Sequence, residues 1–446
     1  MSNQSTRRDF IKTTAGLAAG GLAAPYIWTN RSAHALEAND RLNVAVIGPG
    51  GRGAGIGHQA GSRGNMVACA DVHRGNAERF ANRYDGRCTI YNDYREMLDK
   101  EDIDVVVCGT PDHSHTKISV DAMQAGKDVY CEKPLTLTIE ESQQICEVVK
   151  ATNCVFQVGT QQRTENHRRF LKAVVIARSG RLGDKLHALS SVGGATSGGP
   201  FPTEEPPEEL DWDLWLGPAP KVPFSPNRIG WNFRWWFEYS GGQVTDWGVH
   251  HTDIALWALN GDQTGVVEAT PVESNFPLGR ELTRDTLLGE NPFQDLPVSY
   301  NVANRFKVDM KLANGNEITL YSGTNELIIS GDQGRIRVNR GGLTGRPIEE
   351  LTEEDKVWLD EEVVKLYGGE PRSHMDNFFA CCRSREQPIS DVFTHAHSVN
   401  ACHIANIAML LDRPVRFDPD QYDFVGDEQA SRLMSREVRD PWKVTL

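Results

Sequence analysis

The feature that most constrains this chain is a regular alternation of short apolar runs and helix-like segments between residues 42 and 163. The first run, LNVAVI, leads directly into a glycine-rich turn and then into a segment that can begin a helix. Four further apolar runs, NMVACA, DVVVC, DVYC and VFQV, follow along the chain. Alternating strands and helices with short loops predict a parallel, doubly wound sheet with ligand sites at the carboxyl ends of its strands.

The glycine-rich turn has the G-x-G-x-x-G spacing of a dinucleotide fingerprint, formed by Gly48, Gly50 and Gly53. Glycines let the backbone approach a pyrophosphate, which the amides at a helix N-terminus can bind. Asp71 ends the next predicted strand, where a carboxylate can accept hydrogen bonds from the adenosine ribose. The sequence therefore predicts an N-terminal Rossmann domain that binds NAD rather than NADP, although Arg74 weakens that preference. The alternative is an α/β domain whose glycine turns bind no nucleotide.

The other cofactor candidates lie in this turn or follow predicted strand ends, which places them on one edge of the sheet. For a single histidine among them, a surface or capping role is the alternative. These further cofactor-binding candidates are Gly51, Arg52, Thr110, Pro111, Asp112, His115, Glu132 and Gln161.

The first 35 residues have the pattern of an export signal and are excluded from the fold prediction. Arg7 and Arg8 precede a mildly apolar, glycine-rich stretch that ends in the small-x-small sequence AHA at 33–35. This pattern is typical of a twin-arginine signal peptide, which would direct the folded protein to the periplasm. The alternative is an uncleaved amphipathic helix or membrane anchor, for which the apolar stretch is short.

Composition narrows the possible partners. The formal net charge is −14, with 39% apolar and 24% charged residues. Such an acidic chain disfavours nucleic acid and anionic membranes, and a neutral or polar small molecule is easier to accommodate. The nine cysteines are an odd number without metal-ligand spacing, so we predict neither a disulfide framework nor a metal site.

At CEKPLT, residues 131–136, the chain resembles the Gfo/Idh/MocA family of glucose–fructose oxidoreductase and inositol dehydrogenase, whose E-K-P signature falls at this strand end. A second family signature, G-G-x-x-x-D-x-G-x-H-x-x-D, matches GGQVTDWGVHHTD at 241–253. The resemblance extends from Leu42 to the C-terminus. It implies an NAD-dependent enzyme for sugars or polyols, a cis Lys133–Pro134 bond and assembly into a homodimer or homotetramer.

Oxidation of an alcohol carbon needs a hydride acceptor, a base for the hydroxyl proton and a donor for the developing alkoxide. With the resemblance in view, Lys133 is the candidate that binds the substrate oxygen beside the nicotinamide. Asp246 and His250 are four residues apart, so on one helix they would share a face, with His250 as general acid/base and Asp246 as its partner. The alternative is a capping aspartate and a packed core histidine.

The segment NRIGWNFRWWFEYSGG offers aromatic and cationic side chains for a sugar just before the second signature. The rings of Trp231, Trp235 and Trp236 suit the C–H faces of a sugar, and an arginine suits its oxygens. The alternative for the tryptophans is a core or interface cluster. The substrate-binding candidates are Arg163, Arg234, Trp235 and His251.

The pattern changes after residue 165, so we predict a nucleotide domain over 36–165 and an α+β domain over 166–446. A Pro- and Glu-rich stretch at 198–226 predicts a long surface excursion. Period-two runs around turns at 314–315 and 331–334 predict hairpins of a large, mostly antiparallel sheet. This second domain would bind substrate and support oligomerisation, and its last helices, expected near 372–384 and 391–411, would cover a sheet face or return to the nucleotide domain.

The leading interpretation is an NAD-dependent oxidoreductase for a secondary alcohol of a sugar, polyol or glycoside. A redox-neutral NAD-dependent glycosidase is the alternative, and a non-catalytic sugar or nucleotide sensor is a third reading. An exported enzyme cannot draw on a free nicotinamide pool, so we expect tightly bound NAD. Residues 36–41 and the loop around Arg52 are the candidates to cover it.

Overall fold

A six-stranded parallel sheet forms the N-terminal part of the structure, a computed structural model that describes residues 41–445. The strand order is β3-β2-β1-β4-β5-β6, so successive connections reverse direction between β1 and β4. This is the doubly wound arrangement that the sequence predicts, with its ligand crevice at that switch point. The predicted export signal lies outside the described residues. The strands are β1 (Asn43–Ile47), β2 (Asn65–Ala70), β3 (Thr89–Tyr91), β4 (Val105–Cys108), β5 (Asp128–Cys131) and β6 (Phe156–Val158).

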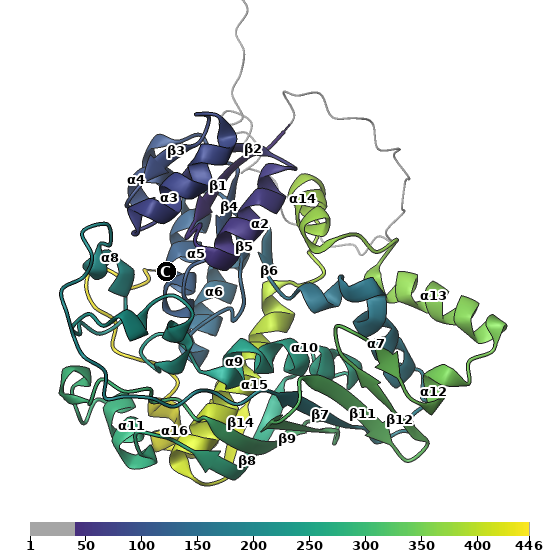
Figure 1. Cartoon of the computed structure of the whole chain (residues 1–446). Coiled ribbons are helices and arrows are strands. Elements are labelled where there is room, and N and C mark those ends of the chain that lie inside the picture. The colour runs from purple at the N-terminus through teal and green to yellow at the C-terminus, as the bar shows by residue number, and fades with distance from the viewer. Residues whose placement is uncertain (1–40, 446) are drawn as a thin grey trace, which may run out of the picture. The chain divides into compact units, whose positions relative to one another are not determined.

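Helices cover both faces of this sheet. One face packs Val44 and Val46 against α2 and α3, and α14 from much later in the chain adds Phe378 to the same cluster (Figure 1). The other face packs against α5 and α6. The C-terminal region therefore returns to the nucleotide domain. The helices concerned are α2 (Gly51–Gly61), α3 (Arg74–Ala81), α4 (Tyr94–Lys100), α5 (His115–Gln124), α6 (Ile139–Thr152) and α14 (His374–Ser384).

The second sheet has nine strands in the order β13-β12-β11-β7-β10-β9-β8-β14-β15. Only β7 and β10 pair in parallel, so the sheet is mixed and mostly antiparallel, and the predicted fold class is confirmed. Along β9 exposed and buried residues alternate strictly, as the period-two pattern predicts. The strands are β7 (His187–Val192), β8 (Val266–Asn275), β9 (Arg305–Leu312), β10 (Glu317–Ser322), β11 (Glu326–Gly331), β12 (Gly334–Val338), β13 (Leu343–Thr344), β14 (Val415–Asp418) and β15 (Asp423–Phe424).

Two buried helices, α10 and α15, lie between the sheets and carry the second signature to the centre of the molecule (Figure 1). No helix within residues 41–445 has the length and apolar content needed to cross a bilayer. All nine cysteines are free thiols. The remaining helices are α7 (Arg169–Arg178), α8 (Trp212–Leu216), α9 (Gln243–Asp246), α10 (Gly248–Ala258), α11 (Arg280–Leu287), α12 (Arg346–Glu349), α13 (Glu353–Tyr367), α15 (Val392–Leu411) and α16 (Glu428–Arg432).

The Pro- and Glu-rich excursion folds back onto the nucleotide domain. The amide of Asp211 donates to the carbonyl of Val72 at 2.9 Å, and the amide of Arg74 donates to the carbonyl of Glu209 at 2.9 Å. The C-terminal tail joins it, because Arg439 donates to the Gly217 carbonyl at 2.7 Å. Figure 1 shows the C-terminus beside α8. The excursion is therefore a packed cover over the carboxyl end of β2.

Candidate active site

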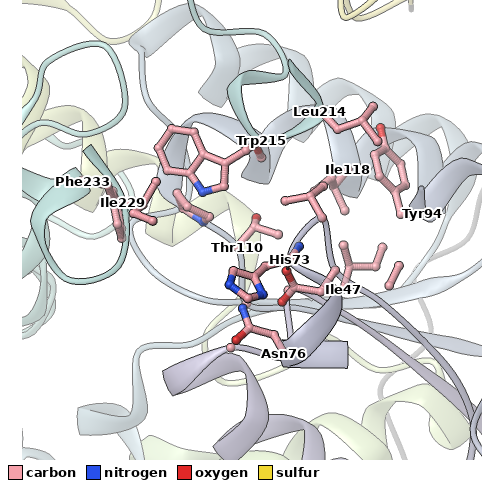
Figure 2. Close-up of a pocket in the computed structure, with 18 of the residues that line it drawn as sticks. Ile47, His73, Asn76, Tyr94, Thr110, Ile118, Leu214, Trp215, Ile229 and Phe233 are labelled. Atoms are coloured by element: carbon pink, nitrogen blue, oxygen red, sulfur yellow. Dashed lines mark hydrogen bonds between the residues drawn. The ribbon is translucent and has the colours of Figure 1, made fainter. Parts of the chain in front are cut away.

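A cavity of about 540 Å³ opens at the carboxyl ends of β1, β2, β4 and β5. This volume lies within the ordinary range for small-molecule sites. Figure 2 shows residues of the nucleotide domain, such as Thr110 and Asn76, facing Trp215 and Phe233 from the second domain. The predicted residues that line it are Gly48, Gly50, Gly51, Arg52, Asp71, Thr110, Pro111, Asp112, Glu132, Lys133 and Arg234.

The glycine turn leaves room for a ligand against its backbone. Gly48 has a φ of +74°, and a Cβ there would lie 2.7 Å from the side chain of Thr110. At Gly53 a Cβ would lie 1.9 Å from the Gly48 carbonyl oxygen, so this glycine lies beneath the cavity wall and permits the close packing of α2 on β1. Because α2 begins at Gly51, its free amides face the cavity, as a pyrophosphate requires.

Asp71 lies in the cavity wall directly after β2, close to the glycine turn: a Cβ on Gly50 would be 4.0 Å from its Oδ2. Its Oδ1 accepts a hydrogen bond from the amide of His73 at 2.8 Å. Burial raises the pKa of Asp71 to about 6, so the carboxylate is ionised at neutral pH. Asn76, which the sequence analysis missed, lines the cavity beside it from the first turn of α3. These groups fit an adenosine ribose, so the residues present suit NAD.

Lys133 follows β5 at the boundary between this cavity and the second domain. Its Nζ donates to Oδ1 of Asp246 at 2.6 Å and to the Asp246 carbonyl oxygen at 2.9 Å. The Nε of Arg234 lies 3.1 Å from the same Oδ1. Burial alone would raise the pKa of Asp246, but the charges of Lys133 and Arg234 lower it below the usual value. Two cations thus share one ionised carboxylate, and the Lys133–Pro134 bond is cis.

The expected pairing of Asp246 with His250 is wrong. The helix is interrupted, because α9 ends at Asp246 and α10 begins at Gly248. Lys133 takes the Asp246 carbonyl that would receive the next helical hydrogen bond, and the amide of His250 donates instead to Trp247 at 3.1 Å. Asp246 therefore positions Lys133, while His250 belongs to the following helix.

His250 is buried beside a residue that the sequence analysis did not single out. Nη2 of Arg340 lies 3.3 Å from Nε2 of His250, and the Nδ1 atom is buried without a hydrogen-bond partner among residues 41–445. Burial, followed by the charges of Lys133 and Arg340, holds the pKa of His250 well below its usual value. The imidazole is therefore neutral, as a proton acceptor must be.

Two predicted cofactor residues position others instead of lining the cavity. The ring nitrogens of His115 contact the carbonyl oxygens of Pro134 and Thr110 at 2.7 and 2.9 Å, which ties two strand-end loops together. Gln161 donates to Glu132 at 2.9 Å, and Arg52 donates to the same carboxylate at 3.0 Å. Both contacts fix the loops that carry Lys133 and the glycine turn.

Cysteines at two strand ends approach His115. Ligand atoms of Cys108, His115 and Cys131 lie within 4.8 Å of one another, a cluster that the sequence spacing did not indicate. Both imidazole nitrogens already contact carbonyl oxygens, so the ring has no nitrogen left for an ion. The two thiols are fully buried, and we interpret the trio as packing.

Three of the predicted substrate residues lie away from the cavity. Arg163 forms a buried, bidentate ion pair with Asp253 at 2.7 and 2.8 Å. His251 contacts Oδ1 of Asn325 at 2.7 Å, and burial lowers its pKa to about 4. Trp235 belongs to the hydrophobic core. None of these side chains lines the cavity, so their assignment to substrate binding is corrected.

Of the three tryptophans predicted to suit a sugar ring, Trp231 lines the cavity, and it is 63% exposed. The guanidinium of Arg234 stacks 4.1 Å from its ring centroid, so both members of this pair face the opening. Leu214 and Trp215 of α8 line the cavity (Figure 2). Trp442 of the tail lines it as well. The composition of residues 198–226 indicated a surface loop. Within it, the apolar sequence WDLWL, which forms α8, was the one local indication that part of the loop packs against the protein.

Both domains of this chain match models of one oxidoreductase family. Residues 42–160 match the family model described as "Oxidoreductase family, NAD-binding Rossmann fold", and residues 197–276 and 301–444 match "Oxidoreductase family, C-terminal alpha/beta domain". Glycosyl hydrolase family 109 protein 1 of Shewanella sp. strain MR-4 is 29% identical over 208 residues, which are 41% of this chain and 44% of that protein.

Two further proteins are similar over different lengths. Inositol 2-dehydrogenase of Salmonella typhimurium is 30% identical over 122 residues, or 27% of this chain and 36% of that one. The alignments with these curated relatives thus span less than half of their lengths. The structure of the WlbA dehydrogenase of Chromobacterium violaceum with NADH and UDP-GlcNAcA shares the fold, with a TM-score of 0.59 and 17% identity over 84% of this chain and 96% of that one. The matched domains show that this chain belongs to the Gfo/Idh/MocA oxidoreductase family.

Proposed function

We propose that the protein is an NAD-dependent oxidoreductase that acts on a secondary alcohol of a sugar, polyol or glycoside. The observation that carries the proposal is the position of Lys133, whose ammonium group is held by Asp246 at the mouth of the dinucleotide cavity. His250 is buried and neutral, and the charge of Lys133 contributes to its lowered pKa. A hydride acceptor, an oxygen-binding cation and a base are the three groups that alcohol oxidation requires.

Each residue has a distinct part in this reaction. Bound NAD supplies the hydride acceptor. Lys133 stabilises the alkoxide oxygen as it develops, and Asp246 fixes the direction of that ammonium group. His250 accepts the hydroxyl proton at Nε2. Trp231 and Arg234 offer a ring face and a cation to the rest of the substrate.

A redox-neutral glycosidase is the second candidate, and the similarity to glycosyl hydrolase family 109 proteins favours it. Both candidates begin with oxidation of a sugar carbon by the same lysine and histidine. Incubation of the purified protein with a panel of polyols, aldoses and p-nitrophenyl glycosides separates them. NADH accumulation with a ketone product supports the dehydrogenase, aglycone release without net NADH supports the glycosidase, and no reaction with any member contradicts both.

The cover over the cavity supports tight retention of NAD. Residues 36–40 lie outside the described residues, and Arg41 donates to Gly64 at 2.7 Å beyond the far end of α2, so the expected N-terminal cover has no support there. The observed cover is instead α8 with the tail around Trp442.

We propose that NAD binds in the cytoplasm before export by the twin-arginine route, and that the protein forms a homodimer or homotetramer. Fractionation of cells carrying Arg7→Lys with Arg8→Lys tests the route, and light scattering tests the assembly.

Replacing Trp215 with alanine is expected to speed NAD release by about tenfold, because its ring closes the cavity wall and its loss removes apolar contact. Trp212→Ala is the matched control: it lies on the same helix and stacks on Trp215 with centroids 4.8 Å apart, but does not line the cavity. Stopped-flow displacement of NADH measures both release rates. Equal rates in the two variants would remove α8 from the retention of NAD.

NAD affinity is expected to fall about tenfold between pH 8 and pH 5, because Asp71 titrates near pH 6 and only its ionised form accepts both ribose hydroxyls. Asp71 is ionised above pH 7 and is progressively protonated below pH 6. The affinity for NAD therefore decreases as the pH falls. Asp71→Asn is expected to bind NAD more weakly at every pH without this slope, and to narrow the gap between NAD and NADP. Calorimetric titrations with both nucleotides check it, and a persistent slope in the variant places the titrating group elsewhere.

A further inference from the structure

The hairpin tip between β12 and β13 presents Arg340 in a fixed position. Oδ1 of Asn339 accepts hydrogen bonds from the amides of Gly341 and Gly342 at 2.8 and 2.9 Å, which closes the turn. Arg169, in the first turn of α7, donates to the Arg340 carbonyl oxygen at 2.8 Å. The turn is thus closed by its own hydrogen bonds and joined to α7 through the Arg340 backbone.

The Arg340 side chain reaches the second family signature. Its guanidinium stacks on Trp247, 4.4 Å from the ring centroid, and Nη2 lies 3.3 Å from Nε2 of His250. The desolvation of the guanidinium, with the charge of Arg52, lowers the pKa of Arg340 from its usual value. Arg340 is thus an exposed residue whose guanidinium is partly covered where it meets Trp247 and His250.

Arg340 differs from the other cations of the site in having no carboxylate partner among residues 41–445. Arg52 pairs with Glu132 at 3.0 Å, while Lys133 and Arg234 share Asp246. Four cations therefore share two carboxylates, in a chain whose formal net charge is −14. An accessible guanidinium without a carboxylate in contact keeps its hydrogen-bond donors available for an anionic ligand.

We propose that Arg340 binds an oxyanion on the substrate, a carboxylate or a phosphate group attached close to the carbon that reacts. A planar guanidinium binds either group through two parallel hydrogen bonds, and stacking on Trp247 leaves its edge free to do so. The substrate class is then an acidic or phosphorylated sugar. This inference rests on the proposed function, because it assigns the substrate to the same site.

Anion binding also prepares His250 for its role. In the structure Arg340 donates toward Nε2, the atom that must accept the hydroxyl proton. When the guanidinium turns to a substrate oxyanion, that lone pair is released. The added negative charge also opposes the effect of Lys133 and Arg340 on the imidazole, which makes it a stronger base.

Binding of charged and neutral sugars to the NAD-loaded protein tests the proposal. The probes are D-glucuronate, its neutral analogue D-glucuronamide, D-glucose 6-phosphate and D-glucose, titrated calorimetrically into wild type, Arg340→Gln and Arg335→Gln. Arg335 lies on the same hairpin, is exposed and has no role in the site, so its variant removes an equal charge. Wild type is expected to bind at least one anion about tenfold more tightly than its neutral counterpart, and only Arg340→Gln to lose that preference.

The outcomes distinguish failure of the proposed anion site from failure of the proposed oxidoreductase activity. A preference for glucuronate identifies a carboxylate site, and a preference for glucose 6-phosphate identifies a phosphate site. Equal binding of charged and neutral sugars, no binding of either anion, or weaker NAD binding as the main effect of Arg340→Gln overturns the proposal. Because binding is measured without turnover, an anion preference in a protein that oxidises nothing would contradict the oxidoreductase alone. Turnover of neutral sugars without charge preference would contradict the anion site alone.

Discussion

Replacing Lys133 with methionine is expected to lower kcat by about a thousandfold while NAD affinity stays within a factor of about two. The ammonium group is the cation that can bind the substrate oxygen, and methionine keeps the length of the side chain without the charge. The pyrophosphate cradle is built by Gly48, Gly50 and the start of α2, none of which depends on that charge. The expected signature is therefore loss of turnover with intact cofactor binding.

Lys117→Met is a matched control for this variant. Lys117 lines the same cavity and is equally buried, with 16% of its side chain exposed against 13% for Lys133, and it also pairs with an aspartate, Asp121, at 2.6 Å. Lys117 lies on α5, and its partner Asp121 belongs to the same helix, whereas the partner of Lys133 belongs to the second signature. Single-turnover reduction of bound NAD, with nucleotide content measured in parallel, compares the two. Normal turnover in Lys133→Met, or equal loss in Lys117→Met, would contradict the assigned role.

The nucleotide half could be predicted because its chemistry is encoded locally. The turn from Gly48 to Gly53 follows its strand directly, and each glycine answers a requirement that is set within a few residues. Asp71 follows the next strand at the same edge of the sheet. In a parallel sheet the carboxyl ends of all strands meet at one edge, so strand ends alone identify most of the cavity wall.

The substrate side could not be predicted in the same way, because side-chain direction there depends on distant packing. Trp231 and Trp235 are four residues apart, yet one faces the opening and the other the core. Arg163 has the chemistry of a ligand-binding residue, but its guanidinium is bound by Asp253, Thr394 and the Ile389 carbonyl. The carbonyl of Asp246 at the end of α9 accepts from Lys133, more than a hundred residues earlier, a contact that local sequence does not indicate.

The position of Arg340 beside His250 could not be predicted from the sequence either. Nothing in the sequence around the hairpin tip distinguishes it from Arg335 or Arg337, which are exposed on the same strand. Its proximity to His250 arises from the pairing of β11 with β7 and β12, which brings the hairpin alongside α10. Only the three-dimensional contact shows that Arg340, of the three arginines, lies beside His250.

Arg163→Met is expected to destabilise the protein by about 3–5 kcal/mol, because it leaves the Asp253 carboxylate buried without its counter-ion. The Arg163 charge holds the pKa of Asp253 well below its usual value against the effect of burial. A carboxyl with a lowered folded-state pKa stabilises the protein above its unfolded pKa, and loses that contribution as pH falls toward the folded value. The stability difference between wild type and variant is therefore expected to shrink as the pH falls and Asp253 of the variant takes up a proton.

Arg168→Met provides the control, since Arg168 pairs with Glu370 at 2.6 Å on the surface and such pairs contribute at most about 1 kcal/mol. Guanidinium denaturation at several pH values measures both variants, with KM determined on folded protein. The guanidinium of Arg163 contacts Asp253, Thr394 and the Ile389 carbonyl but does not line the cavity. If its role is structural, Arg163→Met lowers the unfolding midpoint without a selective rise in KM. A selective rise in KM with unchanged stability would return Arg163 to the substrate site, where its residue type alone had placed it.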